Sequence, residues 1–233
     1  MPRMVRLRRV LTGWMLVFGL TAPSAGCLGF LHTIKEPTAT ACQDLPAPCR
    51  EHIHVFLIDG LDPCDLANLR GVRDYVNALG FQNTRYGQFY DAEPFGDEIR
   101  RIHKDDAAAR FVVIGFSLGA RRARGMVESL QGDGVHVDLL VYLDGKSLMY
   151  VSPDAPGNVD RVLSAVGPGV VWTAPQLPGA DNVVLSDVWH FGVPSHPRTL
   201  EALARELATV AGESAGAGAG TAPPLGPSSD LTP

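Results

Sequence analysis

Apolar and polar positions alternate in blocks along residues 49–211. Short, almost wholly apolar runs suit buried strands, and the stretches between them carry apolar residues at helical spacing. The apolar runs predict strands at residues 54–58, 111–114, 137–143, 170–172 and 182–185, and a further strand is predicted at residues 84–90. The amphipathic stretches predict helices at residues 62–79, 95–109, 118–130, 159–166 and 197–210. The sequence therefore predicts a three-layer α/β domain, with a mostly parallel sheet of about six strands and helices on both faces.

Residues that commonly begin and end helices mark three of the boundaries. Asp62 and Pro63 suit an N-cap and a first helical position, and Gly80 suits the position after the last turn. Pro197 suits the first turn of the closing helix. We therefore expect the first helix to begin at Asp62 and the last to begin at Pro197.

Residues 1–27 are typical of a bacterial export signal. Arginines at positions 3, 6, 8 and 9 precede an apolar run at residues 10–21, which is short for a membrane span. Small residues follow and lead to Cys27, and residues 24–27 resemble the lipid-attachment box of lipoproteins. We expect an exported protein, either anchored to a membrane through a lipidated Cys27 or cleaved and released into the periplasm or the medium.

Composition sets the limits of the folded domain. Residues 212–233 are mostly Gly, Ala, Pro and Ser, which bury too little surface to offset the entropy of ordering, so we expect a disordered tail there. Residues 28–48 are expected to be a linker, and residues 49–211 the domain. In an exported chain, Cys42, Cys49 and Cys64 would form one disulfide and leave one thiol, but the sequence does not specify the pair.

Charge argues against nucleic acid as a partner. The net charge is −5, and after the first ten residues the basic side chains are scattered, apart from a short cluster at Arg121, Arg122 and Arg124. Hydrophobic residues make up 45% of the chain, enough for a real core. The composition therefore indicates a globular domain with another kind of partner, and nothing in it specifies an oligomeric state.

A possible nucleophile lies at Ser117. Residues 115–119 have the pattern Gly-x-Ser-x-Gly, with a predicted strand directly before them and a predicted helix directly after them. Such a strand-turn-helix holds the serine in a strained backbone conformation that needs small neighbours, and it exposes the hydroxyl above the sheet. The helix N-terminus and the Leu118 N–H would then face a developing oxyanion.

A serine nucleophile needs a base, and two histidines follow the last predicted strand. The segment at residues 189–200 contains His190, His196 and Pro197 and resembles the terminal segment of α/β-hydrolases. In that family the catalytic histidine follows the last strand and a proline opens the final helix. The resemblance therefore favours His190 as the base over His196, which suits an N-cap of the final helix.

The same resemblance implies an acid and a second oxyanion donor. The usual place for the acid, residues 173–180, offers no carboxylate, whereas Asp144 ends the preceding strand, where some lipases carry theirs. Asp181 and Asp187 are alternatives. The loop after the first strand implies the N–H of Leu61 or its neighbour as the donor, and Asp59 there is expected to point away or to cap the next helix.

These residues predict a serine hydrolase that cleaves a small ester or thioester through an acyl-enzyme, without a metal or an organic cofactor. The absence of a long insertion predicts an open, shallow site. Two alternatives remain. Residues 57–63 resemble the metal-binding opening of phosphodiesterases and phosphatases, although the further ligands of those enzymes are missing. The domain could also be an inactive, anchored hydrolase-fold protein that acts in binding.

Overall fold

The computed structural model describes residues 48–145, 153–168 and 176–219 of the chain. The export signal with Cys27, most of the linker, the predicted strand at residues 170–172 and residues 220–233 lie outside this part. Cys42 also lies outside it, so the disulfide stays a prediction. Within the described residues, no helix combines the length and the hydropathy needed to cross a membrane.

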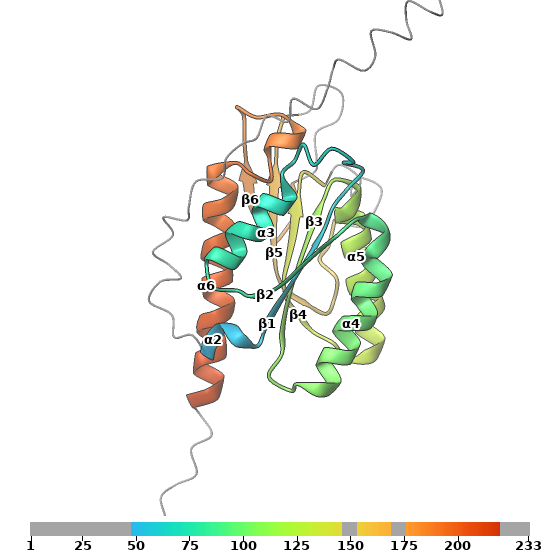
Figure 1. The fold of residues 1–233 in the computed structure, drawn as a ribbon, viewed down its shortest axis with the longest axis vertical. Coiled ribbons are helices and arrows are strands. Elements are labelled where there is room, and N and C mark those ends of the chain that lie inside the picture. The colour runs from blue at the N-terminus through green and yellow to red at the C-terminus, as the bar shows by residue number, and fades with distance from the viewer. Residues whose placement is uncertain (1–47, 146–152, 169–175, 220–233) are drawn as a thin grey trace, which may run out of the picture. The chain divides into compact units, whose positions relative to one another are not determined.

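A parallel sheet of six strands forms the centre of the domain (Figure 1). The strands lie in the order β2-β1-β3-β4-β5-β6, and every neighbouring pair is parallel. Their bounds are β1 Ile53–Ile58, β2 Asn83–Gly87, β3 Arg110–Phe116, β4 Val137–Leu143, β5 Val159–Val166 and β6 Asp181–Val184. Parallel pairing requires a crossover between strands, which explains why helices separate most of them.

Helices cover both faces of the sheet, which gives the predicted three-layer α/β fold (Figure 1). The helices are α2 Pro48–Glu51, α3 Leu69–Ala78, α4 Ala92–Asp105, α5 Leu118–Leu130 and α6 Pro197–Ala219. Short 3₁₀ turns occur at η2 Phe89–Asp91, η3 Gln131–Asp133 and η5 His190–Gly192. Helices α3 and α6 lie on one face of the sheet, and α4 and α5 lie on the other.

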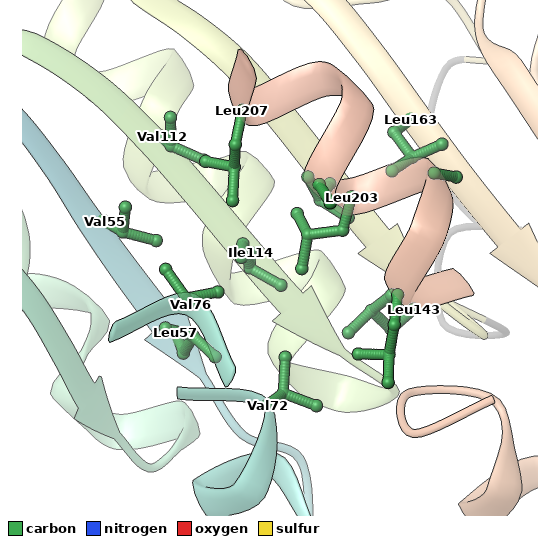
Figure 2. Close-up of a cluster of buried hydrophobic side chains, with 14 of the residues drawn as sticks. Val55, Leu57, Val72, Val76, Val112, Ile114, Leu143, Leu163, Leu203 and Leu207 are labelled. Carbon is green, nitrogen blue, oxygen red and sulfur yellow. The ribbon is translucent and has the colours of Figure 1, made fainter. Parts of the chain in front are cut away.

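Alternate side chains of the central strands supply two separate cores. Val55 and Leu57 of β1 enter the core under α3 and α6, whereas Phe56 and Ile58 enter the core under α4 and α5. Figure 2 shows the first of these clusters, in which strand and helix residues interdigitate. Its labelled members are Val55, Leu57, Val72, Val76, Val112, Ile114, Leu143, Leu163, Leu203 and Leu207.

The helix predicted at residues 159–166 is wrong, because this segment forms β5. Its apolar residues recur at helical spacing, but Val162 to Val166 are all buried and the segment pairs with β4, with Val141 opposite Leu163. A strand covered on both faces is buried at consecutive positions, so its sequence does not need to show a period of two. Tertiary burial therefore decides the structure here against the local pattern.

The first helix also begins later than predicted. Residues 61–68 form turns, and α3 begins at Leu69 with Asn68 as its N-cap, where the Asn68 side chain accepts the N–H of Gly71. The Asp62 carboxylate accepts the N–H of Ala67 at 2.7 Å and so caps a turn. The C-terminal signal at Gly80 is confirmed, since Gly80 has φ 99° directly after the C-cap.

The last helix runs further than predicted. It begins at Pro197 as expected but continues to Ala219, so the disordered tail expected from residue 212 is wrong for residues 212–219. Glu213 explains part of this extension, because its carboxylate accepts hydrogen bonds from Arg110 at 3.2 Å and Arg161 at 3.0 Å. These contacts tie the extra turns to the ends of β3 and β5.

Candidate active site

Ser117 lies in a sharp turn between β3 and α5. Its backbone has φ 52° and ψ −116°, a region that residues with a β-carbon rarely adopt and that costs about 1–3 kcal/mol. The Ser117 N–H donates to the Leu143 carbonyl at 3.0 Å, which ties the turn to the end of β4. The strand-turn-helix that the motif predicts is therefore present, with its strain at the serine.

Close packing explains both glycines of the motif. A β-carbon on Gly115 would lie 2.6 Å from the Cα of Ala120, and one on Gly119 would collide with the carbonyl oxygens of Ile58 and Asp59. Neither contact can relax cheaply, since the opposing atoms belong to the backbone. The two glycines thus let α5 leave the turn directly against the ends of β1 and β3.

His190 lies in the segment after the edge strand β6 and contacts Ser117. It begins the η5 turn after β6, and its Nε2 lies 3.0 Å from Ser117 Oγ. The Phe116 ring stacks on the imidazole at 4.8 Å between centroids, and the Phe191 ring packs edge-on at 5.0 Å. Two aromatic rings therefore fix the plane of the imidazole, a role that the sequence did not reveal.

Asp144 lies behind His190. It follows β4, is fully buried and has φ 44°. Its Oδ2 lies 2.5 Å from His190 Nδ1, and its Oδ1 accepts the N–H of Gly167 at 3.2 Å. The three residues thus form a continuous chain of contacts from hydroxyl to imidazole to carboxylate.

The alternative base and the two alternative acids contact other residues. His196 Nε2 is 3.4 Å from Asp187 Oδ2, and its Nδ1 accepts the N–H of Arg198 at the start of α6. Asp181 pairs with Arg205 at 2.6 Å. Neither these carboxylates nor His196 contacts Ser117 or His190 in the described residues, so the structure brings together only the favoured three.

The loop after β1 packs directly against the Ser117 turn. A β-carbon on Gly60 would lie 2.9 Å from Ser117 Cβ and 3.3 Å from the Leu118 nitrogen. The Gly60 N–H is occupied, because it donates to Asp59 Oδ1 at 2.7 Å. The N–H groups of Leu61 and Leu118 have no acceptor among the described residues, which leaves both available beside the serine.

Asp59 points towards β2 and does not cap α3. It is fully buried, and its Oδ2 accepts the Tyr86 hydroxyl at 2.7 Å. The Gln88 amide donates in turn to the Tyr86 oxygen at 2.8 Å. Burial raises the pKa of Asp59 to about 6, although the hydrogen bonds that Asp59 accepts from Tyr86 and from the Gly60 N–H work against this rise. Burial and the Asp59 contact also raise the pKa of Tyr86.

Three carboxylates near this loop have the spacing of possible metal ligands. Oxygens of Asp59, Asp62 and Asp65 lie within 4.8 Å of one another. Each already serves the local backbone: Asp59 accepts from Gly60, Asp62 from Ala67, and Asp65 from Leu69 at 3.1 Å. The cluster is therefore accounted for as capping groups of the turns that lead into α3.

Comparisons with known proteins give the following matches. The sequence matches no protein-family model, and it matches no curated protein. Among solved structures it is similar to the crystal structure of the NocB thioesterase domain from the nocardicin cluster. The two are 17% identical with a TM-score of 0.38, and the match covers 73% of this chain and 96% of that chain. The assignment of a three-layer, hydrolase-like α/β fold rests on the sheet order and the crossovers described above.

Proposed function

We propose that the protein is a serine hydrolase that cleaves a carboxylic ester or thioester through an acyl-enzyme on Ser117. The observation that carries the proposal is the chain of contacts from Ser117 Oγ to His190 Nε2 at 3.0 Å, and from His190 Nδ1 to Asp144 Oδ2 at 2.5 Å. The strained Ser117 backbone and the two unpartnered N–H groups beside it support the same chemistry.

In the first half-reaction, Ser117 Oγ attacks the carbonyl carbon while His190 Nε2 takes the hydroxyl proton. The carbonyl π electrons move to the oxygen, and the N–H groups of Leu61 and Leu118 hydrogen-bond the resulting oxyanion. As the tetrahedral intermediate collapses, His190 returns the proton to the leaving alcohol or thiol. Asp144 keeps Nδ1 protonated and stabilises the imidazolium in between.

In the second half-reaction, water replaces the leaving group. His190 Nε2 takes a proton from the water, whose oxygen attacks the acyl carbon, and the same two N–H groups bind the new oxyanion. Collapse breaks the bond to Ser117 Oγ, which regains its proton from His190. The products are a carboxylic acid and the free enzyme, and His190 Nε2 carries the transferred proton in both half-reactions.

A fluorophosphonate probe tests the nucleophile directly. Wild-type protein should be labelled, and Ser117→Ala and His190→Ala should not be. Ser129→Ala is the matched control, because Ser129 is an exposed serine on the helix that follows Ser117. A folded wild-type protein that does not react would contradict the proposal and favour an inactive domain that acts in binding.

We also propose that the protein is exported and held at a membrane through Cys27. The support is the sequence of residues 1–27 alone. Expression of the full chain in a bacterium should place it in the membrane fraction with an acylated Cys27. The Cys27→Ala variant should carry no lipid in either the soluble or the membrane fraction. Acylation of that variant would exclude Cys27 as the anchor.

A further inference from the structure

A groove of about 900 Å³ begins beside the candidate nucleophile. One wall is α5, which starts at Leu118, the residue after Ser117. The other wall is η2 and α4, which lie beside α5 on the same face of the sheet (Figure 1). One end of the groove, at Leu118, is therefore next in the chain to the candidate nucleophile.

Two arginines line the α5 wall of the groove. Arg121 and Arg122 are exposed, and neither guanidinium group forms an ion pair or a hydrogen bond with any residue that the structure describes. Arg124, two residues further along the helix, differs in being buried and bound to Glu128 at 2.8 Å. The groove therefore offers two positive charges that no side chain in the described part of the protein compensates.

The opposite wall combines aromatic rings with the charged side chains of Glu93, Asp97 and Arg100. Tyr90 is 67% exposed, and its ring packs edge-on against that of Phe89 at 5.3 Å. Asp97 accepts a hydrogen bond from Arg100 at 3.0 Å, which leaves Glu93 as the acid without an ion-pair partner among the described residues. An anion would therefore find an attractive wall on α5, and apolar parts of the same molecule would contact the rings of η2.

The distance from the serine suits one substrate molecule. Arg121 follows Ser117 by four residues, and a helix rises about 1.5 Å per residue, so their backbones are separated by about 6 Å along α5. An arginine side chain extends a similar length. A group bound by the guanidinium can thus belong to the same molecule as a carbonyl at Ser117, a few bonds away from it.

We propose that this groove binds an acidic group, a carboxylate or a phosphate, carried by the ester or thioester substrate, with Arg121 and Arg122 as its ligands. The inference rests on the proposed function, since it assigns the substrate class of that same site. Planar guanidinium groups match both kinds of oxyanion through paired N–H donors. Because the arginines are exposed, the attraction is screened by salt.

Two series of esters test the proposal with the full protein: aryl acetates that differ in the leaving phenol, and phenyl esters that differ in the acyl group. In the first, the leaving phenol carries a carboxymethyl, a phosphonomethyl or an uncharged carbamoylmethyl group. In the second, phenyl hemiglutarate is compared with its uncharged amide. For at least one series, wild-type kcat/KM should favour the charged ester, and the preference should shrink in molar salt. The carboxymethyl and phosphonomethyl arms distinguish a carboxylate from a phosphate.

The variants should change the charged and uncharged esters differently. Arg121→Gln with Arg122→Gln should lower the ratio of kcat/KM for the charged ester to kcat/KM for the uncharged ester about tenfold, mostly through KM for the charged ester. Glu93→Gln should act in the opposite direction and favour the charged ester. Arg73→Gln is the matched control, because it removes an exposed positive charge on α3, outside the groove.

The outcomes separate this inference from the proposed function. Hydrolysis that depends on Ser117, with a ratio of charged to uncharged ester that is the same in wild type and the double variant, overturns the groove assignment alone. An absence of Ser117-dependent hydrolysis on every ester overturns the proposed function and this inference with it. A fall of the ratio in the double variant, with Arg73→Gln like wild type, supports both.

Discussion

The carboxylate of Asp144 reaches the imidazole of His190 across the end of an intervening strand. Asp144 follows β4 and His190 follows β6, with β5 between them, and yet Oδ2 and Nδ1 lie 2.5 Å apart. The Gly167 N–H, just after β5, donates to the other carboxylate oxygen and holds it in this position. An acid that comes one strand early along the chain can therefore still orient the histidine.

Asp144→Asn should lower kcat about 10³- to 10⁴-fold while the protein stays folded. The amide cannot hold the imidazole with Nδ1 protonated and does not stabilise the imidazolium. Steady-state kinetics on a simple aryl ester, with circular dichroism as a check of folding, measures this. Asp187→Asn and Asp181→Asn serve as controls and should stay close to wild type, and a larger loss in either would move the acid away from Asp144.

His190→Ala and His196→Ala should differ by several orders of magnitude in kcat. Nε2 of His190 lies 3.0 Å from Ser117 Oγ, whereas His196 contacts Asp187 and caps the first turn of α6. We expect His190→Ala to be inactive and His196→Ala to keep activity with a small loss of stability, about 1 kcal/mol. The measurements are kcat/KM and urea denaturation. Inactivity of His196→Ala with His190→Ala active would reverse the assignment.

Local patterns predicted the described strands other than β5, and the turn around the serine, because runs of apolar residues and the Gly-x-Ser-x-Gly pattern involve neighbours in the chain. The run at residues 137–143 forms β4 with those bounds. Gly115 is required by a contact with Ala120 in the same turn, whereas Gly119 is required by the carbonyl oxygens of Ile58 and Asp59, far away in the chain. The motif therefore marks both glycines in the sequence, although only one of the two contacts is local.

Features that depend on tertiary contacts were not predicted. The segment of β5 has helical spacing, and only its place between β4 and β6 makes it a strand. The stacking of Phe116 on His190 and the hydrogen bond from Tyr86 to Asp59 join residues far apart in the chain. No spacing rule within one sequence links such pairs, so the second layer of the site became visible only in the structure.

Gly60→Ala should impair the site, because its β-carbon would lie 2.9 Å from Ser117 Cβ. Either the loop or the serine turn must shift, which we expect to cost about 1–3 kcal/mol of stability and to lower kcat. Gly125→Ala is the matched control, since nothing lies within 4 Å of its added β-carbon in α5. That variant should gain about 0.5–1 kcal/mol. Equal effects in the two variants would contradict the close packing of the loop on the serine.

Asp59 should make stability fall as the pH rises through a defined window. Burial raises its pKa in the folded state from 3.8 to about 6, so between these values the folded protein holds a proton that the unfolded chain has released. The free energy of unfolding must then decrease with rising pH across this window, and the loss is complete above about pH 6.

Asp59→Asn removes this titration and should flatten that part of the curve. The amide can still hydrogen-bond within the pocket of Gly60 and Tyr86, so the absolute stability can change while the slope reports the titration. Urea denaturation at a series of pH values measures both quantities, with Asp74→Asn as an exposed control that should keep the wild-type slope. If Asp59→Asn ran parallel to wild type across the window, Asp59 would have to be ionised at its ordinary pKa, and its burial against Tyr86 would have to be relieved in solution.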